Sequence, residues 1–188
     1  MSGENRFLSR ELIMNSKALY AFLSESTVRL HLDYLRTQRL KLSIIEKSHP
    51  QIKGKSGREI LRMKLKRDLR SEIISLYSDI CAHQLYFSSF AENPAPSEIV
   101  RRRYGSENSF VYEMKKAAQA IGTGFVFVLK GRRGTPEIKT LSRASEELLT
   151  EEPLLVLDLC EHAYFPDYGF ALDKYLNAAL SHIDLSRL

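Results

Sequence analysis

Three histidines and one aspartate have the residue types and the spacing of a metal-binding site. His31 and His83 each fall on the apolar stripe of a long predicted helix. Asp158 ends a short apolar strand, where an unpaired carboxylate would be costly, and His162 follows four residues later. A single histidine on an apolar face is more often an ordinary core residue. The combination indicates a site, because adjacent antiparallel helices can bring both rings to one point, and Asp158 and His162 can turn to the same point.

Three imidazoles and one carboxylate form a donor set for a first-row transition metal. Donors of this softness suit iron or manganese, and ligand type alone does not exclude zinc. Four protein ligands leave a fifth position for solvent. The sequence therefore predicts a mononuclear metal centre and does not choose between iron and manganese.

The elements that must position these side chains are two long helices followed by a small sheet. The first helix is capped by Ser24 or Ser26 and ends near His49-Pro50. After a basic loop over residues 51–58, a second helical stretch runs to about Phe90. The rest predicts a helix at 107–120, strands at 124–129, 137–141 and 154–159, and a final helix at 172–183.

This order predicts an α+β fold of two parts. Residues 1–91 are expected to form an N-terminal long helical hairpin domain, in which residues 1–15 are a loose arm. Residues 92–106 hold two prolines and a glycine and are the best candidate for a linker. Residues 107–188 are expected to form a C-terminal α/β domain with a three-stranded antiparallel sheet.

The composition excludes several classes of protein. At 188 residues, with 44% hydrophobic and 27% charged residues, the chain is neither disordered nor fibrous. It lacks an apolar run of about 18 residues, so we expect no membrane span. The polar start predicts a cytoplasmic protein, and two cysteines build no disulfide framework. The basic stretch 58–70 allows contact with RNA, a membrane surface or small anions, but a solvated helix face is the favoured interpretation.

The segment from Asp158 to Tyr168 (DLCEHAYFPDY) resembles the D-x-W-E-H-A-Y-x-x-D-Y signature of the iron/manganese superoxide dismutases. Weaker matches to the family's other motifs lie at 27–31, 82–87, 122–127, 174–175 and 181–183, so the resemblance extends from about residue 18 to the C-terminus. It implies the family's architecture of a helical hairpin followed by an α+β domain. It also implies that one iron or manganese ion per subunit is held by His31, His83, Asp158 and His162.

The resemblance further implies a homodimer and a small anionic substrate, superoxide. Glu161 matches a glutamate that crosses the family's dimer interface to the partner's ligand histidine, and Tyr164 matches a second residue of that interface. The expected reaction is the disproportionation of superoxide to dioxygen and hydrogen peroxide.

Several residues beside the expected ligands depart from the family pattern. Leu35 and Arg39 stand where the family has a histidine and a tyrosine that gate the substrate funnel. The resemblance places Asp79 at one of the two positions from which a glutamine contacts the metal-bound solvent, and a count from the strand at Gly124 places Arg143 at the other, whereas a count back from Asp158 gives a different residue. The two side chains are expected either to form an ion pair in place of the glutamine contact or to point to solvent. The family's tryptophans are replaced, because this chain has none; the substitutes are Phe87, Phe125, Phe127 and Cys160.

Three functions remain open at this point. The leading one is superoxide dismutation, in which Arg39 would attract the anion. The second is a repurposed metalloenzyme of the same fold that acts on dioxygen or peroxide and an organic substrate. The third is a non-catalytic, dismutase-like RNA-binding scaffold, supported by the basic stretch 58–70 and opposed by the retained ligand set.

Overall fold

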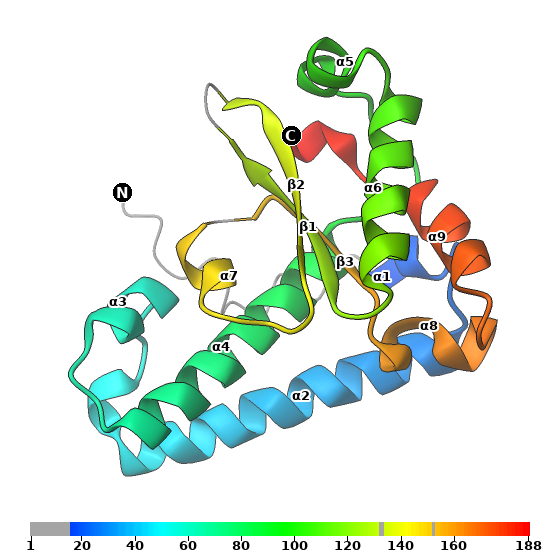
Figure 1. The fold of residues 1–188 in the computed structure, drawn as a ribbon. Coiled ribbons are helices and arrows are strands. Elements are labelled where there is room, and N and C mark those ends of the chain that lie inside the picture. Colours follow the sequence, from blue (N-terminus) through cyan, green and yellow to red (C-terminus); the bar gives the residue numbers. More distant parts are fainter. Residues whose placement is uncertain (1–15, 132–133, 152) are drawn as a thin grey trace.

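Two long antiparallel helices form the N-terminal half of the molecule in this computed structural model, which describes residues 16–131, 134–151 and 153–188 (Figure 1). The predicted loose arm at residues 1–15 lies outside the described residues. The hairpin consists of α2 (Glu25–Ser48) and α4 (Arg67–Ser88), with α1 (Ser16–Leu19), the 3-10 turn η2 (Pro50–Ile52) and α3 (Gly57–Arg62) around them. The side chain of Ser24 accepts the backbone N–H of Thr27 and so begins α2, as predicted.

The basic stretch 58–70 is not one helix, contrary to the prediction. A capping box between Ser56 and Glu59 begins α3, which ends at Arg62, and α4 begins at Arg67. The backbone leaves the helical conformation at Met63, with φ −74° and ψ 142°, and the Leu65 N–H then donates to the Met63 carbonyl at 3.1 Å in a tight turn. Met63 and Leu65 pack against the core, and this burial favours the turn over a continuous helix.

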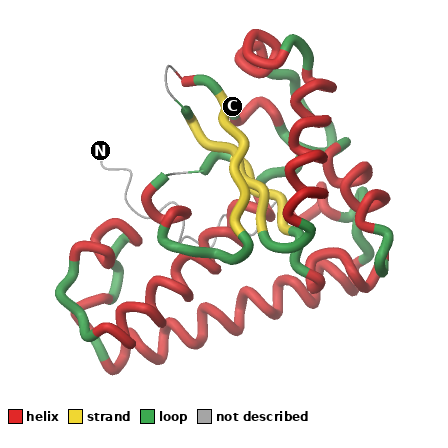
Figure 2. The backbone as a smooth tube through the Cα atoms, in the orientation of Figure 1, coloured by secondary structure: helices red, strands yellow, loops and turns green. Residues whose placement is uncertain are grey.

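The C-terminal half is a three-stranded sheet surrounded by helices (Figure 2). Its strands are β1 (Phe125–Lys130), β2 (Pro136–Leu141) and β3 (Leu155–Asp158), and its helices are α5 (Glu98–Tyr104), α6 (Glu107–Ile121), α7 (Glu147–Thr150), α8 (Glu161–Tyr168) and α9 (Leu172–Leu180), with η4 (Leu185–Arg187) at the end. The predicted linker 92–106 therefore contains a helix, α5.

The sheet is antiparallel throughout, in the order β2-β1-β3, which confirms the predicted α+β fold. Phe125 pairs with Leu141 of β2 and with Asp158 of β3. Gly124 directly precedes the central strand, with φ +108°, and a Cβ there would lie 2.2 Å from the Leu141 carbonyl oxygen. Only glycine fits that position without displacing the neighbouring strand.

The two halves share one hydrophobic core, in which α4 packs against both α2 and β3. A further bridge joins Phe90, just after α4, to Ile183, just after α9. The end of β3 and the start of α8 consequently lie against the open end of the helical hairpin, near the start of α2 and the end of α4 (Figure 1). Within the residues that the structure describes, every helix is too short or too polar to cross a bilayer.

Candidate metal centre

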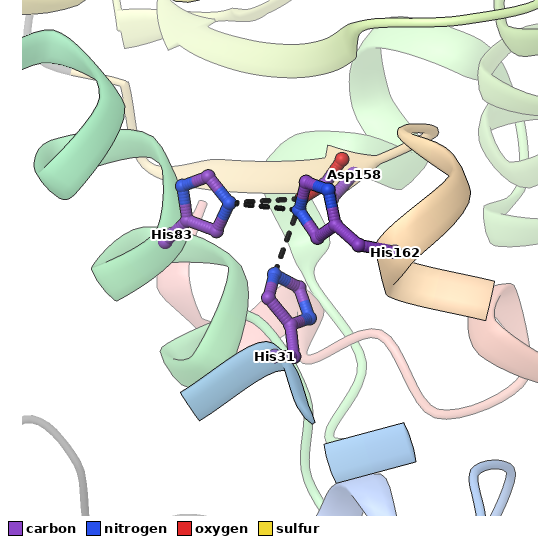
Figure 3. Close-up of side chains that lie close together, drawn as sticks. All are labelled: His31, His83, Asp158 and His162. Atoms are coloured by element: carbon purple, nitrogen blue, oxygen red, sulfur yellow. Dashed lines mark hydrogen bonds and ion pairs between the residues drawn. The ribbon is translucent and has the colours of Figure 1, made fainter. Parts of the chain in front are cut away.

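The side chains of His31, His83, Asp158 and His162 converge between α2, α4, β3 and α8 (Figure 3). The Nε2 atom of His31 lies 3.3 Å from Asp158 Oδ2, and those of His83 and His162 lie 3.5 Å from the same oxygen. The four potential ligand atoms all lie within 4.8 Å of one another. The structure thus brings together all four residues that the sequence predicted as ligands.

Polar atoms at this point lack partners from the described chain. The side chains of His31, His83 and Asp158 are fully buried, and only that of His162 is partly exposed, at 30%. His31 Nε2 and Asp158 Oδ2 are buried and have no hydrogen bond. The distances from Asp158 Oδ2 to the Nε2 atoms of His31 and His83 are 3.3 and 3.5 Å, longer than the roughly 2.7–2.9 Å of a charge-assisted hydrogen bond. A cation at the centre of the cluster would satisfy these atoms, so the residues fit a single iron or manganese ion.

The protonation states also suit a cation. Burial lowers the pKa of His83 to about 4 and lowers the pKa of His31 as well. Burial alone would raise the pKa of Asp158, but the neighbouring His162 and His31 outweigh it and bring that pKa below its ordinary value. At neutral pH the two buried imidazoles are therefore neutral and the carboxylate is ionised, the states that metal binding requires.

Hydrogen bonds to the surrounding chain orient two of the four side chains. Nδ1 of His83 donates to the backbone carbonyl of Asp79 at 2.7 Å, so its Nε2 lone pair faces the centre. Oδ1 of Asp158 accepts the backbone N–H of Cys160 at 2.8 Å. The Asp158 carbonyl accepts the hydroxyl of Tyr175, also at 2.8 Å. Together these bonds leave Oδ2 of Asp158 as the oxygen directed toward the three imidazoles.

Tyr34 is a site residue that sequence reasoning missed. Its ring stacks on His162, with centroids 4.5 Å apart and planes 19° apart, and lies 4.9 Å from the ring of His83. It is three residues after His31, whereas the family's gate positions are four and eight residues after that ligand. The signal was present, because residues i and i+3 of a helix are neighbours on its surface.

Asp79 lies next to Tyr34. Burial raises the pKa of the Asp79 carboxyl to about 6, while hydrogen bonding from the Tyr34 hydroxyl acts in the opposite direction. Burial and the Asp79 charge both raise the pKa of Tyr34 above its ordinary value. The phenol therefore keeps its proton at physiological pH.

The expected ion pair between Asp79 and Arg143 is not present. Arg143 is exposed in the loop after β2, where the chain turns into solvent, and has no ion pair within the described residues. Arg39 is half-buried, its Nη2 has no hydrogen-bond partner there, and burial lowers its pKa. Leu35 is a buried core residue. None of these three side chains makes a hydrogen bond or ion pair with the four converging residues.

Cys160 lies directly beside the cluster. Its Sγ is 3.9 Å from the Gly124 carbonyl oxygen, and burial, followed by the nearby Asp158 charge, raises the pKa of the thiol. A thiol held in its protonated form is a poor nucleophile, so its position favours a packing role. Phe87 and Phe125 also stand where the family has tryptophans. The ring centroid of Phe87 lies 4.9 Å from that of His31, and the ring centroid of Phe125 lies 5.9 Å from that of His83.

The two residues expected at a dimer interface lie in different environments. Tyr164 is buried, and its ring stacks on Tyr175 of the same chain at 4.8 Å. Glu161, the first residue of α8, is exposed and has no hydrogen bond or ion pair with the described part of the chain.

The sequence is similar to known proteins over its C-terminal half and beyond. Residues 92–188 match the family model for the C-terminal domain of iron/manganese superoxide dismutases. An iron superoxide dismutase of Bordetella pertussis is 32% identical over 102 residues, which cover 50% of this chain and 53% of that protein. The iron superoxide dismutase of Escherichia coli K12 is 29% identical over 131 residues, 65% of each chain. The matches thus span between about half and two thirds of these relatives.

The matched segment contains β3 and α8, which supply Asp158 and His162, while the helical hairpin supplies the other two histidines at the same point. The fold, the three histidines and one aspartate that converge, and the sequence similarity all point to the same family. The chain belongs to the iron/manganese superoxide dismutase family.

Proposed function

We propose that the protein is a superoxide dismutase that uses one iron or manganese ion per subunit. The observation that carries this proposal is the convergence of three imidazoles and one carboxylate within 4.8 Å, with His31 Nε2 and Asp158 Oδ2 left without partners. His31, His83, Asp158 and His162 would hold the ion. The ion would supply the one-electron couple that converts one superoxide to dioxygen and another to hydrogen peroxide.

The exposure of the ligands favours a small substrate. Three of the four ligand side chains are fully buried, and the partly exposed one, His162, is covered on one ring face by Tyr34. A diatomic anion needs little room beside these rings. An organic substrate would reach the cluster only if the rings of His162 and Tyr34 both moved. This supports dismutation over a repurposed oxidation of a larger molecule.

Proton supply is assigned to Tyr34. Peroxide formation consumes two protons, and the family's gate histidine and tyrosine are replaced here by Leu35 and Arg39. The Tyr34 hydroxyl retains its proton and lies beside two of the ligands and the Asp79 carboxyl. Asp79, with a pKa of about 6, can return a proton to that phenol from solvent, since its side chain is 19% exposed.

A homodimer is proposed on the exposed side of α8. Glu161 is free to reach a second copy, as the family pattern implies. Close to it in the sequence, Phe165 and Phe170 form an edge-to-face pair and are 38% and 95% exposed. An exposed aromatic pair of this kind is typical of an interface. Sedimentation or light scattering of the wild type and of Glu161→Arg tests the assembly.

The function is tested by metal analysis followed by a superoxide-consumption assay. Purified protein should contain close to one iron or manganese ion per chain, and the loaded protein should consume superoxide far faster than the free ion does. His31→Gln should lose both properties. His49→Gln removes a histidine from the far end of the same helix and should retain both. A metal-free wild type, or loaded protein no faster than free metal, contradicts the proposal.

A further inference from the structure

The positive charge of the protein is concentrated in one segment. Residues 47–70 contain nine Lys and Arg against two Asp and Glu, a net charge of +7. Of the chain's 28 basic and 23 acidic residues, the other 164 positions therefore hold 19 and 21, a net charge of −2. Outside this segment, which we call the hairpin tip, the protein is slightly acidic.

The fold places the hairpin tip at the end of the molecule away from α8 and α9 (Figure 1). It comprises the last turn of α2, η2, α3 and the first turn of α4. Exposed cations of the tip have no hydrogen bond or ion pair within the described residues; they include Lys53, Arg62, Lys64, Lys66 and Arg67. These charges are available to an external partner.

The tip holds its cations on an anchored backbone. In the short connection between α3 and α4, exposed Arg62, Lys64 and Lys66 alternate with Met63 and Leu65, which pack against the core. The buried side chains fix this backbone, and the three cations are left facing solvent. Charges on a folded backbone lose less conformational entropy on binding than charges on a flexible tail do.

Distance separates the tip from the metal centre. Lys47 follows His31 by sixteen positions along α2, which at 1.5 Å per residue is about 24 Å. The Debye length at physiological salt is about 8 Å, so the tip charges are largely screened from an anion entering the metal centre. Steering of superoxide therefore does not account for the concentration of charge in the tip.

We propose that the hairpin tip binds the phosphate backbone of double-stranded nucleic acid without sequence preference. Lys and Arg contacts to phosphates need no base recognition and supply most non-specific affinity. The tip contains no Phe, Tyr or Trp, so it lacks the large aromatic side chains on which single-strand binders stack unpaired bases. Its apolar residues do not favour a membrane, because Ile52 and Ile60 are fully buried and Met63 and Leu65 face the core, which leaves no apolar side chain to insert.

Fluorescence anisotropy of the metal-loaded, full-length protein with a labelled mixed-sequence DNA duplex tests the proposal. If about four tip cations contact phosphates, the slope of log K against log salt is about −3.6, so affinity falls about 100-fold between about 50 and 200 mM salt. A duplex of unrelated sequence should bind equally well. The variant K64Q/K66Q/R67Q should bind at least about 10-fold more weakly at the lower salt, with a slope shallower by about 2.7.

An equal loss of charge at the opposite end of the molecule is the matched control. R102Q/R103Q/K116Q removes three exposed cations from α5 and α6 and should bind like the wild type. Both triple variants should keep their helical circular dichroism and metal content. The proposal is overturned if the wild type does not bind the duplex at about 50 mM salt, or if both variants lose affinity equally. Tighter binding to single strands, or to vesicles containing phosphatidylglycerol in preference to duplex, would also overturn it.

Discussion

Replacing Asp79 with asparagine should stabilise the metal-free protein above pH 6 and leave its stability at pH 4 nearly unchanged. Burial raises the pKa of this carboxyl from 3.8 to about 6, and its Oδ2 has no hydrogen bond within the described residues. The folded state therefore binds more protons than the unfolded state between these pH values, so Asp79 increasingly destabilises the fold as pH rises through that range. Well below pH 3.8 the carboxyl is protonated in both states and the effect vanishes.

The magnitude follows from the shift. Two units at about 1.4 kcal/mol each give an upper bound of about 3 kcal/mol at pH 7. Because the side chain is 19% exposed, solvent weakens the effect, and we expect a gain of about 1–2 kcal/mol for Asp79→Asn.

The assay is urea unfolding of both proteins, stripped of metal, at several pH values between 4 and 8. The reasoning is refuted if the asparagine variant gains no stability relative to wild type between pH 4 and pH 7, or if the difference is the same at every pH.

Three further changes probe the site and the fold. His31→Ala should weaken metal binding at least about 100-fold, measured by metal content after dialysis against a chelator; an unchanged content would remove this residue from the ligand set. Tyr34→Phe keeps the ring over the neighbouring ligand but loses the hydroxyl, so superoxide turnover should fall about 100-fold with metal content unchanged; undiminished turnover would exclude the phenol as proton donor. Gly124→Ala should lower the free energy of unfolding by more than about 2 kcal/mol, because its Cβ would overlap a backbone oxygen. Gly122→Ala, at a similarly positive φ but with open space around it, should cost only about 1 kcal/mol, and equal losses would show that the close approach is unimportant.

The parts of the fold set by local patterns could be predicted from the sequence. Ser24 and Pro50 delimit α2 by capping and by steric exclusion, and the apolar stripe between them fixes which face is buried. His31 lies on that stripe, so its burial followed directly. The end of β3 at Asp158 was visible as the end of an apolar run, which is why the four converging residues could be found without a structure.

The parts set by packing could not be predicted. No proline or glycine interrupts residues 58–70, so the break between α3 and α4 depends on where Met63 and Leu65 are buried. Tyr34 was missed for a similar reason. The aromatic side chain that covers the ligands is decided by how far each ring reaches between the packed helices. The family motif names positions four and eight residues after His31, so it does not reveal that a tyrosine three residues after His31 covers the ligands instead.

The hydrogen bond from His83 Nδ1 to the Asp79 carbonyl has a consequence for how this site can change over evolution. The acceptor is a main-chain atom one helical turn before the histidine, and every residue type supplies it. Substitutions at position 79 can therefore change the charge and proton affinity beside the cluster while the tautomer of His83 stays the same. Under the proposed function, a change at this one position would tune the electrostatics of the site without removing a metal ligand.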